Sequence, residues 1–113
     1  MKVTDSNVTR YADMFAALGS EPRLRIVRML LAAHPDGLVV SDIQAETGIA
    51  NSTLSHHLEK LKIDALVTTE REKAFIRYRA NTDALEELLG FLYAECCTRN
   101  KAVEPKNVAA ICK

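Results

Sequence analysis

Apolar residues recur along this chain at the three- and four-residue spacing of amphipathic helices, so that one face of each segment can pack into a core. Glycine, serine and proline punctuate these segments where helices begin and end. The spacing predicts a first helix over residues 6–18, closed by Gly19, and a second that starts after Ser20 as cap, with Pro22 in its first turn. A third runs from Asp42 to Thr47, capped by Ser41 and ended by Gly48. The fourth covers roughly residues 52–63, and the last runs from Thr82 or Asp83 to about Cys97.

The period changes to two between the fourth and the last predicted helix, as expected for strands. Leu66–Arg71 and Phe75–Ala80 are predicted strands joined by Glu72-Lys73-Ala74. Upstream, Leu38-Val39-Val40 follows a turn and is either a short strand or an extended lead-in. The second strand alternates, with Ile76 and Tyr78 on one face and Phe75, Arg77 and Arg79 on the other.

The order of these elements predicts a fold of the mainly α (α+β) class: a winged helix-turn-helix with about five helices and a two-stranded wing. Its 113 residues suit one domain, and we assign residues 1–97 to DNA binding and dimerisation. Residues 98–113 show little periodicity and form the expected C-terminal tail. No apolar run reaches membrane-spanning length and the N-terminus lacks a signal-peptide pattern, so we expect a cytoplasmic protein without a membrane partner.

The fourth predicted helix combines a narrow apolar stripe with a polar face of short side chains. Leu54, Leu58 and Leu61 repeat at i, i+4 and i+7. Short hydroxyls near a helix start can approach phosphates and base edges in the major groove. His56 lies on this outward face, where plain solvation is the alternative, whereas His57 borders the stripe and is packed or touches a phosphate. The predicted DNA contacts of this helix are Asn51, Ser52, Thr53, Ser55, His56 and Lys60.

Net charge is zero overall but is unevenly distributed. Residues 51–79 carry six Lys or Arg against four Asp or Glu, whereas residues 82–97 carry four acids and no Lys or Arg. This division suits modest, salt-sensitive DNA binding. Arg71, Lys73 and Arg77 are the predicted phosphate or minor-groove contacts of the wing, with a solvated hairpin as the alternative.

Three cysteines are the second chemical feature of the sequence. Cys96 and Cys97 are adjacent, and Cys112 lies in the tail. An odd number of cysteines does not indicate a disulfide framework in a cytoplasmic protein, and a bond between neighbours is strained. The thiols could converge on one soft ion, and trivalent arsenic or antimony needs only three thiolates. The alternative is that they are small buried hydrophobic residues. No His or Asn/Asp constellation accompanies them, so we expect neither an enzyme nor an organic cofactor.

Two segments, Leu18-Gly19-Ser20-Glu21-Pro22-Arg23-Leu24-Arg25-Ile26 and Ser52-Thr53-Leu54-Ser55-His56-His57-Leu58, resemble those of the ArsR/SmtB family, and the likeness covers about residues 11–97. The resemblance implies a bacterial homodimeric repressor that releases a palindromic operator when a metal or metalloid binds. It also implies that the first and last helices form the dimer interface, which we assign to Tyr11, Phe15, Leu88 and Leu92.

The family places its sensor sites in several locations, and two of them are absent from this sequence. The third helix lacks the Cys-x-Cys arsenic motif, and the last helix lacks the histidines of the zinc, cobalt or nickel site. What remains resembles the arsenite-responsive branch with vicinal cysteines near the end of the last helix. We therefore predict an As(III) or Sb(III) site at Cys96, Cys97 and Cys112, or at the first two for a methylated arsenical. Cadmium, lead or zinc sensing, thiol-redox sensing, and a partner-binding module that does not read DNA remain alternatives.

Overall fold

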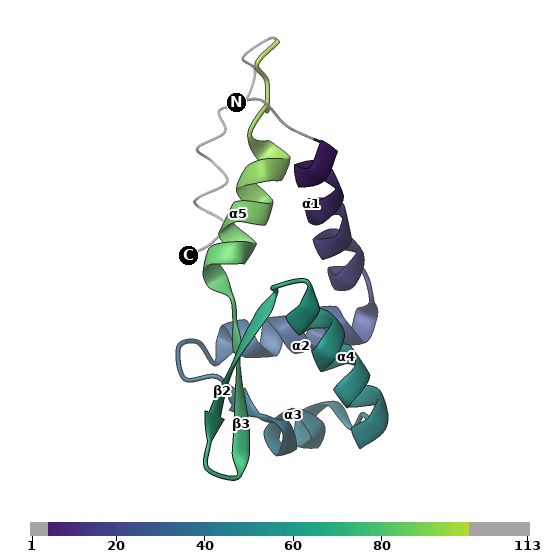
Figure 1. Cartoon of the computed structure of the whole chain (residues 1–113), viewed down its shortest axis with the longest axis vertical. Helices are drawn as coiled ribbons and strands as arrows, with labels where there is room; N and C mark the ends of the chain where they lie inside the picture. Colours follow the sequence, from purple (N-terminus) through teal and green to yellow (C-terminus); the bar gives the residue numbers. More distant parts are fainter. Residues whose placement is uncertain (1–4, 100–113) are drawn as a thin grey trace. The chain divides into compact units, whose positions relative to one another are not determined.

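The computed structural model describes residues 5–99, which form five helices and three strands (Figure 1). This order confirms the predicted winged helix-turn-helix, with one strand added to the wing. The elements are α1 (Asp5–Leu18), α2 (Glu21–Ala32), β1 (Leu38–Val39), α3 (Val40–Thr47), α4 (Asn51–Ile63), β2 (Val67–Glu72), β3 (Phe75–Ala80) and α5 (Thr82–Tyr93).

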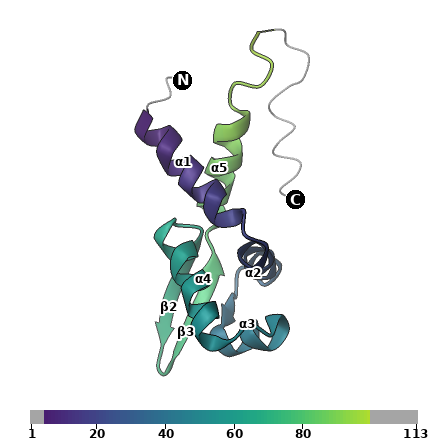
Figure 2. The same cartoon turned by 90° about the vertical axis from the view of Figure 1, so that its right-hand side faces the viewer.

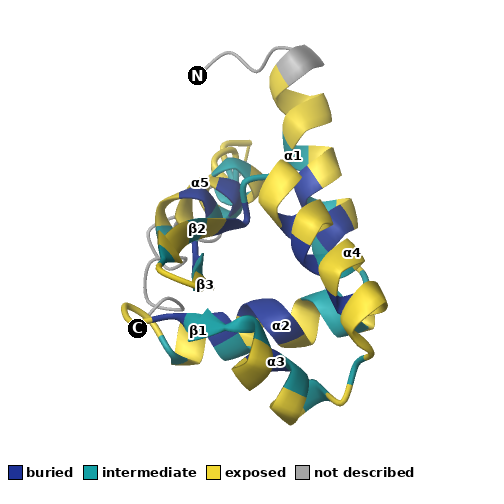
Figure 3. Ribbon diagram, turned by 60° about the horizontal axis from the view of Figure 1, so that its bottom comes forward, coloured by how far each residue is buried: buried dark blue, intermediate teal, exposed yellow. Residues whose placement is uncertain are grey.

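The chain divides after Thr82 into two compact units. The first holds α1 to β3, and Figure 2 shows α2, α3 and α4 gathered beside the β2–β3 hairpin. The core of this unit is entirely apolar within the described residues, and Figure 3 shows buried positions along α2 and α4 beside exposed ones. It comprises Met14, Ala17, Ile26, Val27, Leu30, Ile43, Leu54, Leu58, Leu61, Leu66, Val67 and Ala80.

Glycines end α1 and α3 as predicted, but serine side chains do not start α2 and α3. The Gly19 N–H donates to the Phe15 carbonyl at 2.8 Å, and Gly48 closes α3 in the left-handed region with φ 71°. Ser20 occupies the N-cap position of α2 without a side-chain hydrogen bond. The prediction of Ser41 as cap is wrong, because β1 runs directly into α3 and the extended residue before the helix is Val39.

The wing is part of a three-stranded antiparallel sheet in the order β1-β3-β2. Leu38 and Val39 pair with Tyr78 and Arg77, so the extended lead-in is a true strand. Glu72 pairs with Phe75, which leaves a two-residue turn rather than the predicted three-residue connection. The register places Glu70 and Glu72 on the same face of the sheet as Arg77 and Arg79.

The last helix ends four residues earlier than predicted. α5 stops at Tyr93, and residues 94–99 follow as consecutive turns. The Cys96 N–H donates to the Tyr93 carbonyl at 2.8 Å, an i to i+3 hydrogen bond that tightens the chain relative to an α-helix. Cys97 then adopts a left-handed backbone with φ 62°. The cysteine pair therefore lies in a turn beyond the helix.

Among residues 5–99, no helix is both long and apolar enough to span a bilayer.

Candidate nucleic-acid interface and thiol pair

Helix α4 has the two faces that its sequence predicts. Leu54 and Leu61 are fully buried and Leu58 is 2% exposed. Because these leucines repeat on one side of the helix, their burial turns the opposite side outward. The residues Asn51, Ser52, Thr53, Ser55 and His56, all predicted to contact DNA, are exposed.

The N-terminal end of α4 carries no acidic residue in its first turn, and Ala50 precedes it without a side-chain cap. Its unpaired backbone N–H groups and the positive end of the helix dipole therefore face no carboxylate from that turn. Small polar side chains surround this end, so a phosphate can approach the backbone closely. The arrangement fits the predicted interface.

Lys60, near the other end of α4, is already held by an acid. Its Nζ lies 3.1 Å from Oδ2 of Asp64, whose side chain is only 10% exposed, whereas that of Lys60 is 46% exposed. Lys60 and Lys62 both lie in the last turn, where positive charge suits the helix dipole. A phosphate contact by Lys60 would therefore compete with its ion pair to Asp64.

His57 is half-buried at the border of the leucine stripe, beside a residue from α2. Its Nδ1 lies 3.4 Å from Nη1 of Arg23, and the Nε–H of Arg23 donates to the Ala17 carbonyl at 2.7 Å. Burial lowers the pKa of His57 below its ordinary value, and the positive charges of Arg23 and His56 lower it further. The sequence left the role of Arg23 undecided, because its partners are 6 and 34 residues away.

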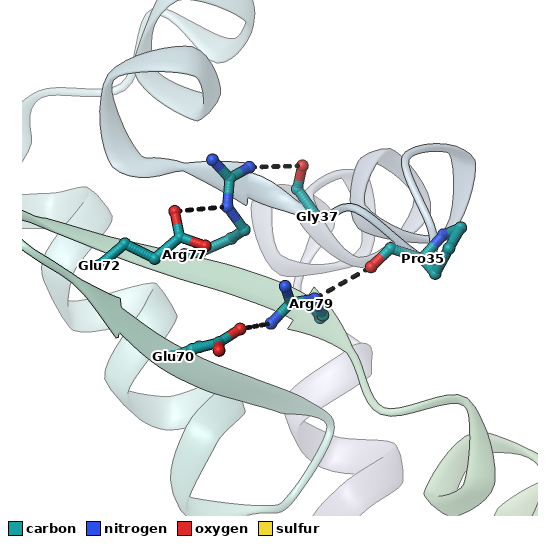
Figure 4. A network of polar contacts seen from close by, with 6 residues as sticks. All are labelled: Pro35, Gly37, Glu70, Glu72, Arg77 and Arg79. Atoms are coloured by element: carbon teal, nitrogen blue, oxygen red, sulfur yellow. Dashed lines mark hydrogen bonds and ion pairs between the residues drawn. The ribbon is translucent and has the colours of Figure 1, made fainter.

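Two arginines of the wing are held within the protein (Figure 4). The Arg79 guanidinium donates to Glu70 Oε1 at 2.6 Å and to the Pro35 carbonyl at 2.9 Å. Arg77 donates through Nε to Glu72 at 3.0 Å and through Nη1 to the Gly37 carbonyl at 3.4 Å. These contacts fasten the hairpin to the loop before β1. The sequence analysis did not predict Glu70 and Glu72 as partners of these arginines, although alternation along two paired strands places all four residues on one face.

The tip of the wing is exposed and cationic. Arg71 and Lys73 are both exposed, and Lys73 occupies the turn with φ 51°. Phe75 is 59% exposed and Ile76 is 39% exposed, so apolar side chains stand beside the two cations. This combination suits a groove of DNA, where cations contact phosphates and apolar groups contact sugars or bases.

Cys96 and Cys97 are half-buried and their Sγ atoms lie 2.8 Å apart, in a thiol-to-thiol hydrogen bond. Neighbouring side chains diverge by 100° in a helix, whereas the turn after α5 lets these two meet. The hydrogen bond with Cys97 raises the pKa of the Cys96 thiol. The pKa of Tyr93 is also raised, first by the charge of Cys96 and then by a side-chain hydrogen bond with it.

A third ligand for this pair is not among the described residues. Cys112 lies outside them, and within residues 5–99 no group of three His, Cys, Asp or Glu side chains could hold a metal ion. The structure thus brings together two of the three predicted thiols.

The four predicted interface residues differ in exposure. Tyr11 and Phe15 of α1 are half-buried, and Arg10 lies over the Tyr11 ring, 5.2 Å from its centroid. In α5, Leu88 is buried and Leu92 is 63% exposed. Leu92 is the most available of the four for a second protomer. Their place in an interface stays a prediction.

Comparison with known proteins gives consistent matches. A helix-turn-helix domain family matches residues 18–70. The nodulation protein NolR of Rhizobium meliloti is 32% identical over 95 residues, which is 84% of this chain and 75% of that protein. The putative arsenical resistance operon repressor ArsR2 of Halobacterium salinarum is 33% identical over 76 residues, 67% of this chain and 62% of that protein.

Solved structures agree. HlyU from Vibrio cholerae, a transcriptional activator, superposes with a TM-score of 0.64 at 31% identity, over 80% of this chain and 99% of that one. A homodimeric winged helix-turn-helix DNA-binding domain from Mycobacterium bovis, described as a possible ArsR-family transcriptional regulator, gives a TM-score of 0.65 at 25% identity, over 90% and 97% of the two chains.

Proposed function

The chain belongs to the ArsR/SmtB family of transcriptional regulators, and from this premise we propose that it is a homodimeric repressor released from its operator by trivalent arsenic or antimony. One observation carries the choice of inducer: two adjacent thiols meet in the turn that follows α5. The relatives are named for nodulation, for activation of transcription and for arsenical resistance. Family membership therefore leaves the inducer open, and the thiol pair supplies the argument.

Helix α4 is the proposed reading element. Its exposed residues from Asn51 to His56 combine short hydroxyls, an amide and an imidazole, which can donate to or accept from base edges. The buried leucines fix the helix in the core and so determine which side meets the DNA. Lys60 contributes a phosphate contact from the far end.

The wing adds contacts that do not depend on sequence. Arg71 and Lys73 are exposed and can reach phosphates or the minor groove. Arg77 uses Nε and Nη1 within the protein, so its Nη2 is the group that we assign to a phosphate. Each phosphate neutralised releases counterions, so binding should weaken steeply with salt.

A dimer suits a palindromic operator, because two recognition helices related by a two-fold axis can enter successive major grooves. The homodimeric relative from Mycobacterium bovis supports this assembly. We assign the interface to Tyr11, Phe15, Leu88 and Leu92, and the exposed side chain of Leu92 favours a role there.

The thiol pair suits a soft, thiophilic ligand. When arsenite binds, each thiol gives up its proton, an As–S bond forms and one hydroxyl leaves as water. Cys96 and Cys97 supply two such bonds, and Cys112 is the proposed third ligand. Binding releases the operator only if the ligand prefers the DNA-free form, and coupling of about 1–3 kcal/mol is typical.

Thiol-redox sensing is the second candidate, favoured by the same contact between the Sγ atoms. Peroxide would take two protons and two electrons from the pair, forming an S–S bond while the peroxide becomes two waters. The strain of a disulfide between neighbours would make this bond easy to reduce again.

The test is release of a fluorescent operator duplex from the reduced protein, followed by anisotropy during titration with arsenite, antimonite, cadmium, zinc and peroxide. We expect release by arsenite or antimonite near one equivalent per site. Cys96→Ser and Cys97→Ser should keep operator binding and lose the response. A full response from either variant would remove the thiol pair as sensor, and release by peroxide alone would favour the redox candidate.

Cys112→Ser separates the two versions of the metalloid site. Loss of the arsenite response with retained response to a methylated trivalent arsenical would indicate that Cys112 is the third ligand. An unchanged arsenite response would restrict the site to the vicinal pair.

A further inference from the structure

Arg23 connects three helices of the first unit through one side chain. It stands near the start of α2, donates from Nε to the carbonyl of Ala17 in the last turn of α1, and meets Nδ1 of His57 in α4 with Nη1. Ala17 is fully buried and its carbonyl lies near the helix end, where intrahelical partners run out. The contact therefore ties the end of α1 to the middle of the reading helix.

We propose that Arg23 is a positioning residue for DNA reading: its guanidinium holds His57 as the Nε2–H tautomer and thereby seats α4 against the C-terminal end of α1. This inference rests on the proposed role of α4 in DNA binding. It adds a residue that touches no DNA in the proposed interface but determines where the reading helix lies.

The tautomer follows from donor and acceptor chemistry. A guanidinium has only N–H donors, so the nitrogen facing it must accept. His57 Nδ1 is that nitrogen, which leaves the single proton of the neutral ring on Nε2. Protonation of Nδ1 would place two cations in contact, and the lowered pKa of His57 agrees with a neutral ring. Among residues 5–99, Arg23 and His56 are the groups whose positive charges lower the pKa of His57, and the group of α1 that Arg23 contacts, the Ala17 carbonyl, is neutral.

Lysine could not replace this arginine. The fork of the guanidinium reaches a carbonyl with one nitrogen and an imidazole with another, whereas an ammonium is a single point donor. His57 is adjacent to His56, an exposed residue of the reading face, and lies one turn before Leu61 in the core. A shift of the α4 backbone at His57 would therefore move exposed contact residues along with it.

The experiment measures the tautomer and pKa of the His57 ring separately from the affinity for DNA. Nitrogen chemical shifts of the histidine rings, recorded by NMR in the full chain, should show His57 as the Nε2–H tautomer in wild type and a mixture of tautomers in Arg23→Met. The pKa of His57 from the same spectra should rise in Arg23→Met, because a neighbouring positive charge is lost. An unchanged tautomer and pKa would overturn the proposal.

Affinity for a labelled duplex from the DNA upstream of its own gene gives the second readout. Arg23→Met and His57→Leu should each weaken binding about tenfold, the fold-change expected when one hydrogen bond to a charged group is lost. The double variant should lose no more affinity than the single variant that binds DNA less tightly, because both substitutions remove the same contact. His57→Asn keeps an acceptor at the Nδ1 position and should bind within about twofold of wild type.

Thermal unfolding of each variant shows whether a loss of DNA affinity is accompanied by a loss of stability. Equal losses of affinity in His57→Asn and His57→Leu, or additive losses in the double variant, would show that packing alone acts at these positions and would overturn the proposal. Failure of the wild type to bind the duplex would instead remove the proposed function, and the NMR measurement would still decide whether Arg23 fixes the ring.

Discussion

Lys73 and Arg79 carry the same charge on the same wing but occupy opposite situations, and this difference predicts opposite phenotypes. Lys73 is exposed at the turn, whereas Arg79 is held by Glu70 at 2.6 Å and by the Pro35 carbonyl at 2.9 Å. Replacing each by glutamine removes one positive charge per protomer. We expect Lys73→Gln to change DNA binding and Arg79→Gln to change stability.

The magnitude for Lys73 follows from counterion release. One phosphate contact contributes about 0.9 to the slope of log affinity against log salt, so two wings per dimer contribute about 1.8. Between 50 and 200 mM salt, this slope amounts to about a twelvefold change in the ratio of wild-type to variant affinity. Because phosphate contacts carry no sequence information, binding to unrelated duplexes should weaken equally.

Arg79→Gln should leave that slope nearly unchanged and lower stability. It removes a part-exposed ion pair and one hydrogen bond to a backbone carbonyl, worth together about 1–2 kcal/mol. Anisotropy titrations at several salt concentrations and thermal unfolding by circular dichroism measure both effects. Equal changes of slope in the two variants would show that only net charge matters. An unchanged slope in Lys73→Gln would remove the wing contact.

Further outcomes follow from individual positions. Gly37→Ala should destabilise the protein by about 1–3 kcal/mol from overpacking alone, since a Cβ there would clash with the Tyr78 carbonyl oxygen and the backbone has a φ of +78°; an unfolding curve equal to wild type would contradict the close approach. Leu58→Ala should cost about 2–5 kcal/mol because this side chain is buried in the core, as urea unfolding would measure; a loss below about 1 kcal/mol would place it outside the core. The raised pKa of Cys96 keeps its thiol protonated to higher pH, so alkylation followed by mass spectrometry should accelerate later with pH than for an ordinary thiol. In Cys97→Ala this delay should disappear, and its persistence would mean that the hydrogen bond between the thiols is not its cause.

Much of the candidate interface could be predicted because helix period and strand alternation are local. The spacing of the leucines in α4 predicted its buried face, and their burial leaves the short polar residues exposed. The strand alternation also placed Arg77 and Arg79 on one face. The adjacency of Cys96 and Cys97 is evident from the sequence alone.

The end of α5 shows where local reasoning failed. The apolar stripe suggested a helix to about Cys97, yet the hydrogen bonds after Tyr93 change to an i to i+3 pattern. Periodicity records which face is apolar but says little about the residue at which the last turn tightens. The meeting of the two Sγ atoms depends on that turn.

The sequence by itself determined the order of the elements, the buried face of α4 and the supply of thiols, because each depends on residues close together in the chain. Only the tertiary structure decided which charged side chains are held by other groups of the protein. Arg79 meets Pro35 across 44 residues and Arg23 meets His57 across 34. Such contacts depend on how elements pack, and the pattern within one element does not specify its neighbour.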